Sequence, residues 1–135
     1  MNSRLLSALF LVSILASVAA EPKKTSSPPP PTRLNQYVYL LKLVPRLYDD
    51  NAWTDEDKKT VATHFAHLKA AADEGKVILA GRTLEAGSRT MGMVIFEAFD
   101  TDAATKFMNT DPAIKGKVMT ATVHPYQIAL QRKPQ

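Results

Sequence analysis

The sequence predicts an α+β domain with two helices and four strands in the order β-α-β-β-α-β. Three kinds of observation lead to this fold class. Runs of β-branched and aromatic residues predict the strands, hydroxyl and acidic residues mark the helix starts, and glycine or proline separates the elements. We therefore expect one four-stranded antiparallel sheet with both helices packed on one of its faces.

The first strand and the first helix follow one another near the start of this domain. The segment QYVYLLKLV at 36–44 carries apolar side chains on both alternating faces, which is typical of a strand covered on two sides. A helix is expected over 55–74, because Thr54 can act as N-cap and three acidic residues then face the positive end of the helix dipole. Gly75 stands where a left-handed C-terminal cap is expected. The helix residues expected to face the core are Val61, Phe65, Leu68 and Ala72.

The next elements alternate in the same way. A short buried strand is predicted over 77–81, a hairpin connection over 84–89 and a third strand over 90–99. A second helix is expected to begin after Asp100, which can act as its N-cap, and to end near Thr110 before an Asp-Pro step.

The last extended segment, 118–130, completes the sheet, and Pro125 restricts it to an edge or a bulge. The resulting order is that of the ferredoxin-like fold, a split βαβ arrangement. Both alternating sets of side chains on the third strand are apolar, so the sheet face away from the helices would expose a large apolar surface in a monomer. We therefore expect a homodimer in which two such faces pack together.

Two N-terminal segments precede this domain, which we place at 36–132. Residues 1–20 combine a basic start at Arg4, a short apolar run and small residues before Glu21, a pattern typical of a cleaved secretory signal peptide. The alternative is a retained membrane anchor, although the apolar run is shorter than the roughly 20 residues that a spanning helix needs. Residues 21–35 include four consecutive prolines and predict a disordered, extended linker, with an SH3-type ligand as the alternative. We expect an exported protein, either periplasmic or secreted.

Composition and charge narrow the chemistry. The 135 residues include no cysteine, which excludes disulfides, thiolate catalysis and thiolate metal sites. The formal net charge of +4 comes mostly from the N-terminal segments, because four of the 17 basic residues but only one of the 13 acidic residues lie within the first 33. The rest of the chain has a net charge of +1 and contains no cluster of basic residues. We therefore do not expect nucleic-acid binding.

The positions of histidine and aspartate suggest a catalytic pair. At about 100° per residue, His64 lies about 60° from the centre of the expected apolar stripe and His67 about 120° away, so His64 should border the buried face and His67 should be solvated. Asp111 ends the second helix, from where its carboxylate can orient an imidazole through a ring N–H. A packed structural histidine and ordinary Asp-Pro turn chemistry are the alternatives. Metal binding by the two histidines is a further alternative, but without a third ligand in the pattern we expect neither metal nor cofactor.

Several motifs resemble the YCII-related (YciI-like) domain family over about residues 36–130. They are His64-Phe65-Ala66-His67-Leu68, the helix-ending Gly75, Ala80-Gly81, the third strand, and Asn109-Thr110-Asp111-Pro112. In that family a histidine stands eleven positions before the helix-ending glycine and an Asp-Pro ends the second helix, and these positions are His64 and Asp111 in this sequence. The resemblance implies a dimeric ferredoxin-like α+β barrel with a His–Asp pair in a pocket. One branch of the family is similar to lyases that remove chloride from chlorinated hydroxyhydroquinones.

Three further residues are expected near that pocket. Arg82 stands where the family often has proline, and its planar guanidinium can bind an anionic or enolate oxygen; a solvated strand end is the alternative. His124 and Tyr126 share one face of the last strand and are expected to line the same pocket, with core or interface packing as the alternative. The export signal also departs from the family's pattern, which argues against a cytosolic catabolic role.

Two functions from different classes remain consistent with these observations. In the first, the protein is a cofactor-free enzyme that eliminates a group from, or isomerises, a small cyclic or phenolic substrate. His64 moves the proton, Asp111 orients His64, and Arg82 holds an anionic group. In the second, the same homodimer is a non-catalytic or accessory module that binds a small aromatic ligand without turnover.

Overall fold

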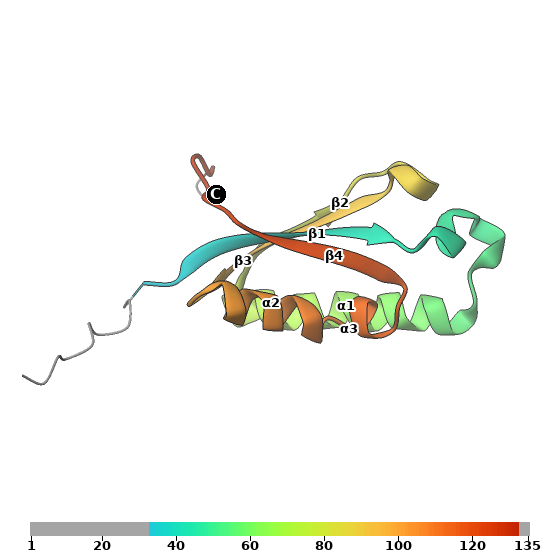
Figure 1. Ribbon diagram of the computed structural model, residues 1–135, viewed down its shortest axis with the longest axis horizontal. Helices are drawn as coiled ribbons and strands as arrows, with labels where there is room; N and C mark the ends of the chain where they lie inside the picture. Colours follow the sequence, from blue (N-terminus) through green and yellow to red (C-terminus); the bar gives the residue numbers. More distant parts are fainter. Residues whose placement is uncertain (1–32, 133–135) are drawn as a thin grey trace, which may run out of the picture.

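Residues 33–132 are described by the computed structural model, and the predicted signal peptide and almost all of the predicted linker lie outside this range (Figure 1). The principal elements are β1 (Asn35–Leu43), α1 (Asp55–Asp73), β2 (Val77–Arg82), β3 (Met91–Ala98), α2 (Thr101–Thr110), α3 (Pro112–Lys115) and β4 (Met119–Pro125). Two short 3-10 helices, η1 (Pro45–Tyr48) and η2 (Asp50–Ala52), lie between β1 and α1. A third, η3 (Gly87–Arg89), joins β2 to β3. Within residues 33–132, no helix has the length and apolar character needed to cross a membrane.

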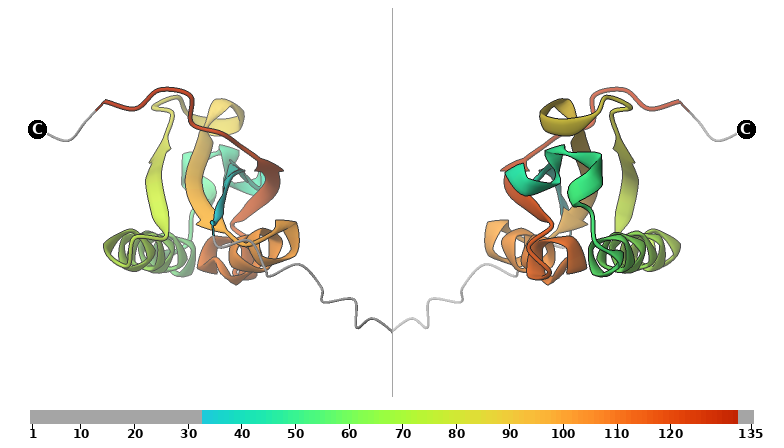
Figure 2. Two further views of the ribbon diagram at one scale, coloured as in Figure 1. Left: turned by 90° about the vertical axis from the view of Figure 1, so that its left-hand side faces the viewer. Right: turned by 90° about the vertical axis from the view of Figure 1, so that its right-hand side faces the viewer.

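The four strands form one antiparallel sheet in the order β2-β3-β1-β4. All the α-helices of the described chain lie on one face of this sheet, with α1 beneath the β2 side and α2 and α3 beneath the β4 side (Figure 2). The predicted α+β class and ferredoxin-like order are therefore confirmed. The last strand is shorter than predicted because it ends at Pro125, and it lies at the sheet edge that proline requires.

The core lies between the sheet and the helices. Because successive strand residues point to opposite faces, Tyr37 and Tyr39 of β1 share the helix side with their β3 partners, Phe96 and Val94. Tyr39, Val94 and Phe96 are completely buried. Phe107 of α2 packs on Phe96 with their ring centroids 4.9 Å apart, which joins the helix layer to the centre of the sheet.

Helix α1 begins and ends at the residues that the sequence predicts. Thr54 accepts a hydrogen bond from the backbone N–H of Asp57, and the Asp57 carboxylate accepts one from the backbone N–H of Thr54, which completes a capping box. Arg46 of η1 donates to both oxygens of Asp57 and so ties the preceding segment to the first turn. After the helix, Gly75 adopts a φ of 79°, a conformation that glycine reaches without strain.

The buried face of α1 is rotated by about 60° from the predicted apolar stripe. Leu68 is buried as expected, but Phe65 is 69% exposed, whereas the His64 side chain is only 12% exposed. The helix packs against α3 as well as against the sheet, and this second contact turns its histidine side inward. The expectation that His67 is solvated is therefore wrong: its ring stacks on Phe107 with centroids 5.6 Å apart.

The centre of the opposite sheet face is also apolar, as the sequence predicts from the third strand, whereas β4 contributes Thr120, Thr122 and His124 to this face. Val38 and Ile95 are opposite one another on the two central strands and are each 7% exposed. Around them, Leu79 of β2 and Met91 of β3 are 49% and 36% exposed. The described residues therefore leave part of this apolar face in contact with solvent.

Candidate functional site

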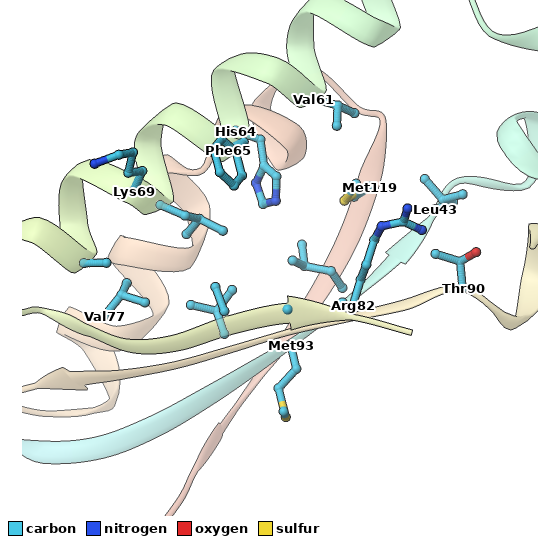
Figure 3. A pocket seen from close by; sticks show the side chains of 17 residues that line it. Leu43, Val61, His64, Phe65, Lys69, Val77, Arg82, Thr90, Met93 and Met119 are labelled. Carbon is cyan, nitrogen blue, oxygen red and sulfur yellow. The ribbon is translucent and has the colours of Figure 1, made fainter. Parts of the chain in front are cut away.

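A cavity of about 520 Å³ opens between α1 and the helix side of the sheet (Figure 3). It exists because small residues line it where β2 and β3 pass the helix: Ala72, Ala80, Gly81 and Gly92. At Gly92 an added Cβ would lie 3.1 Å from the Cβ of Leu41, so the approach of this β1 side chain favours glycine. Most other lining side chains are aliphatic, and such an apolar cavity with a few polar groups is typical of small-molecule sites.

His64 lies near the middle of α1, and its ring points into this cavity (Figure 3). Its Nδ1 lies 2.7 Å from Oδ1 of Asp111, in the turn between α2 and α3. Its Nε2 makes no hydrogen bond to any residue from 33 to 132. The structure thus brings together the two residues that the sequence singled out, and it leaves one ring nitrogen free to meet a ligand.

Asp111 is a completely buried carboxylate with three hydrogen-bond donors around it. Its Oδ1 accepts from the backbone N–H of Ala113 at 2.9 Å as well as from His64, and its Oδ2 accepts from the hydroxyl of Tyr39 at 2.8 Å. Burial alone would raise the pKa of this carboxyl. The hydrogen bond and charge of His64, followed by the bonds from Ala113 and Tyr39, outweigh burial and hold the pKa of Asp111 below its ordinary value.

The local sequence explains why Asp111 stands between two helices. Pro112 disfavours a helical conformation at Asp111, so α2 ends there. The same proline suits the first position of α3, where no backbone donor is needed, and the Asp111 side chain caps that helix through Ala113. Helix α3 was not predicted, since four residues are too few to show a helical period. Its packing against α1 places the carboxylate beside His64.

These contacts determine which nitrogen carries the proton in the neutral form of His64. An ionised carboxylate only accepts hydrogen bonds, so Nδ1 must donate to Asp111, and Nε2 of the neutral ring then keeps its lone pair. Tyr39 remains a neutral donor, because burial, then the charge of Asp111 and the hydrogen bond to it, raise the pKa of Tyr39 far above its ordinary range. An imidazole that is held at one nitrogen and free at the other is suited to act as a general base.

Arg82 ends β2, and its side chain lines the cavity on the same side of the sheet as α1 (Figure 3). Within residues 33–132, its side chain makes only a long hydrogen bond, 3.5 Å to the carbonyl of Thr83, and no carboxylate lies within ion-pair distance. Lys69, another cation at the cavity, is paired with Asp73 at 2.6 Å. Arg82 is therefore available to bind an anion in the cavity.

A second cavity of about 400 Å³ adjoins the first beside η2 and η3. The two share five lining residues: Leu43, Val61, Arg82, Thr90 and Met119. The second cavity is more polar, because the carboxylates of Asp50 and Glu85 also line it. Arg82 therefore stands where an apolar and a polar hollow meet.

The structure does not bring His124 and Tyr126 to the cavity. His124 pairs with Val38 across β1 and β4, and this register places its side chain on the sheet face opposite the helices. The backbone N–H of Tyr126 bonds to the carbonyl of Gln36, which continues that register and leaves Tyr126 on the same face. The two residues share a face as predicted, but the sequence of an edge strand does not reveal which face meets the helices.

His67 does not line the cavity either, and its Nε2 is buried without a hydrogen-bond partner among the described residues. In the part of the chain that the structure describes, no three His, Asp or Glu side chains are grouped so that they could hold a metal ion. Residues 33–132 therefore provide no third ligand for a metal ion bound by His64 and His67 together.

Tyr39 belongs to the site, although the sequence pattern identifies it only as a strand residue. A usable signal exists, since a tyrosine on a strand covered on both sides buries a hydroxyl that needs a partner. The identity of that partner, 72 positions away at Asp111, depends on the tertiary structure.

Comparisons with known proteins place the chain in a family. No curated protein matches it. Among solved structures, the 5-chloro-2-hydroxyhydroquinone dehydrochlorinase TftG from Burkholderia phenoliruptrix AC1100, in complex with 2,5-dihydroxybenzoquinone, is similar to it with 22% identity and a TM-score of 0.53. This match covers 68% of the present chain and 93% of that chain, and at such low identity it shows a shared fold. The profile of the YCII-related domain matches residues 36–126, most of the described domain. The chain therefore belongs to the family of YCII-related domain proteins.

Proposed function

We propose that this protein is a cofactor-free enzyme that transfers a proton to or from a small molecule through His64 and Asp111. One observation carries the proposal: Nε2 of His64 is free and faces an apolar cavity, while Nδ1 is held by a buried, ionised carboxylate. The shared fold with TftG, a dehydrochlorinase, supports small-molecule chemistry of this kind.

The geometry supports an elimination or an isomerisation. Nε2 takes a proton from an acidic O–H or C–H bond of the substrate, and the electron pair of that bond forms a new double bond. In an elimination, a leaving group such as chloride departs with its bonding pair. In an isomerisation, the proton returns from Nε2 to a different carbon. Asp111 stabilises the imidazolium in either case, and Arg82 binds the oxygen on which negative charge develops.

The cavity also favours a class of substrate. Its volume of about 520 Å³ suits a molecule the size of a substituted ring, and its aliphatic walls favour an apolar body. Arg82 is free to pair with one ionised hydroxyl or carboxylate. A small phenolic or cyclic anion meets all three conditions.

The test uses 5-chloro-2-hydroxyhydroquinone as substrate and 2,5-dihydroxybenzoquinone as binding probe, under anaerobic conditions because such phenols oxidise in air. Chloride release by the full chain is measured, and probe binding is followed by calorimetry. We expect His64→Asn to lower kcat by about 10²–10⁴-fold while the probe still binds. The control is Asp102→Asn, which changes an exposed carboxylate in the first turn of α2 that does not line the cavity and should keep the wild-type rate.

Each outcome decides between the two function classes. Full turnover by His64→Asn would overturn the proton-transfer role. Probe binding by the wild-type chain without chloride release would favour the alternative, a non-catalytic module that binds small ligands. If the chain neither binds the probe nor releases chloride, the proposed substrate class is wrong.

We also propose that the protein is a homodimer that pairs through the sheet face opposite the helices. The partial exposure of Leu79 and Met91 around the buried centre of that face supports this pairing, since exposed apolar patches usually mark interfaces. Light scattering at micromolar concentration should give twice the chain mass, and Leu79→Lys should lower it. A monomeric mass for the wild-type chain would overturn the proposal.

Export is a further proposal, which rests on the sequence of residues 1–20 alone. The mature protein should begin at Glu21 in the periplasm or the medium. N-terminal sequencing of the protein from fractionated cells tests this, and an intact N-terminus on a membrane-bound chain would favour the retained anchor instead.

A further inference from the structure

We infer that Tyr39 is a positioning residue of the site: its hydroxyl holds the Asp111 carboxylate in the orientation that presents Oδ1 to His64. Tyr39 is completely buried at the middle of β1 and donates to Oδ2 of Asp111 at 2.8 Å. The catalytic consequence of this contact rests on the proposed function, whereas its effect on Asp111 does not.

The hydroxyl of Tyr39 has a rigid support. Strand β1 is central in the sheet and is hydrogen-bonded on both sides. The Tyr39 ring packs edge-on against Phe96 and Phe107, with centroid separations of 5.6 and 6.3 Å. A donor held by strand pairing and by two aromatic neighbours offers Asp111 a single position for its second oxygen.

Asp111 needs this donor because its other two partners meet the same oxygen. His64 and the backbone N–H of Ala113 both donate to Oδ1, so Tyr39 is the donor to Oδ2 among the described residues. Without the hydroxyl, Oδ2 would be a buried anionic oxygen with no partner, which favours rotation or protonation of the carboxyl. A protonated Asp111 would no longer require Nδ1 of His64 to donate, and Nε2 could lose the lone pair that a general base uses.

Tyr37 provides a matched control on the same strand. Its side chain points to the same face, is also buried and packs against Phe96 with centroids 6.0 Å apart. Its hydroxyl makes no hydrogen bond to another described side chain, and it does not touch Asp111. Tyr37→Phe and Tyr39→Phe therefore each remove one hydroxyl from a ring that packs on Phe96, but only the second removes a donor to the site.

The test compares both variants in the full chain. Carbon-13 NMR of the Asp111 carboxyl should show a raised pKa in Tyr39→Phe and a wild-type titration in Tyr37→Phe. With 5-chloro-2-hydroxyhydroquinone, kcat of Tyr39→Phe should fall roughly tenfold at nearly unchanged KM, on the scale of other outer partners of functional histidines. A wild-type Asp111 titration in Tyr39→Phe, or equal effects in the two variants, would overturn the inference.

A second substitution keeps the test decisive if Tyr39→Phe does not fold. Site-specific 3-fluorotyrosine at position 39 preserves the ring and the hydroxyl but makes the hydroxyl a stronger donor, so the pKa of Asp111 should move down instead of up. A residue that only fills space would produce no change, which would overturn the inference. If Asp111 responds as expected while the wild-type chain shows no turnover, the positioning role stands and the proposed function fails.

Discussion

Replacing Asp111 by asparagine removes the charge of the site with little change in shape. The backbone N–H of Ala113 cannot turn away from Oδ1, so the amide oxygen of the asparagine should occupy that position. His64 then still donates from Nδ1. The amide nitrogen instead meets Tyr39, whose hydroxyl must accept where it formerly donated. The variant should therefore keep the His64 tautomer and lose the charge that supports it.

The expected loss of stability follows from these three hydrogen bonds. A bond to a charged group contributes about 1.5–3 kcal/mol and a neutral one about 0.5–1.5 kcal/mol, so each bond weakens by about 1 kcal/mol. The buried Tyr39 proton also loses its acceptor, and this cost is partly offset because no carboxylate has to be desolvated. We expect Asp111→Asn to lower the free energy of unfolding by about 3 kcal/mol at pH 7, which is about 12–24 °C in Tm for a domain of this size.

The loss should also depend on pH. Because folding lowers the pKa of Asp111, its contribution is fully present above the unfolded value of about 3.9 and disappears as the pH falls through the lower folded value. The free energies of unfolding of the wild type and of Asp111→Asn should differ most near neutral pH and become equal in acid. Urea unfolding followed by the fluorescence of Trp53, the single tryptophan, measures both at pH 7 and in steps below pH 4.

Asp73→Asn is the control, since its carboxylate is exposed and paired with Lys69 at the surface, where such pairs contribute about 0–1 kcal/mol. If Asp111→Asn lowers the free energy of unfolding by less than about 0.5 kcal/mol at pH 7, the estimate from the three hydrogen bonds is wrong. A gap that persists unchanged in acid would contradict the assignment of that loss to an ionised carboxylate. Nitrogen-15 NMR of the His64 ring checks the tautomer, and a proton on Nε2 would show that Ala113 does not hold the amide oxygen.

Three further predictions concern the residues around the site. Gly116→Ala would place a Cβ 2.6 Å from Cγ2 of Thr60 and should cost about 1–3 kcal/mol in urea unfolding; Thr60→Ser should restore part of it. At Gly75, where φ is 79°, an added Cβ would meet no atom of a more distant residue within 4 Å. Gly75→Ala should therefore lower the free energy of unfolding by about 1 kcal/mol through backbone strain alone, and a larger loss would contradict this. Asp57 has a pKa lowered mainly by its hydrogen bond from Arg46, so its stabilisation is present at neutral pH and lost in acid. Circular dichroism should therefore show a flatter acid profile for Asp57→Asn, and an unchanged profile would count against this pair.

The sequence predicts the elements well because their ends are set by neighbouring residues. Thr54 and Asp57 form a capping box within one turn, and Gly75 supplies a backbone conformation that few other residues adopt. The alternating pattern of β1 likewise depends only on the two-residue repeat of a strand. Such local rules extend to the ferredoxin-like order of the elements, which the structure confirms.

The site is predicted in part, since the sequence singles out His64, Asp111 and Arg82, and all three lie at or beside the cavity. The predictions that were wrong concern which face of a helix or of the sheet a side chain occupies. Phe65 was expected in the core because apolar spacing was counted on one helix alone, whereas contact with α3 turns that helix. His124 was expected at the pocket, although the pairing of β4 with β1 sends its side chain to the other side.

By itself, the sequence determined the order of the four strands and the two longer helices, the residues that cap α1 and α2, and which side chains alternate along each strand. Only the tertiary structure decided that Tyr39, Asp111 and His64 form one chain of hydrogen bonds, and which side of the sheet holds the cavity. The physical reason is range: caps and periodicity act over a few residues, whereas a buried carboxylate acquires its partners from strands and helices that lie far apart along the chain and meet only in the packed core.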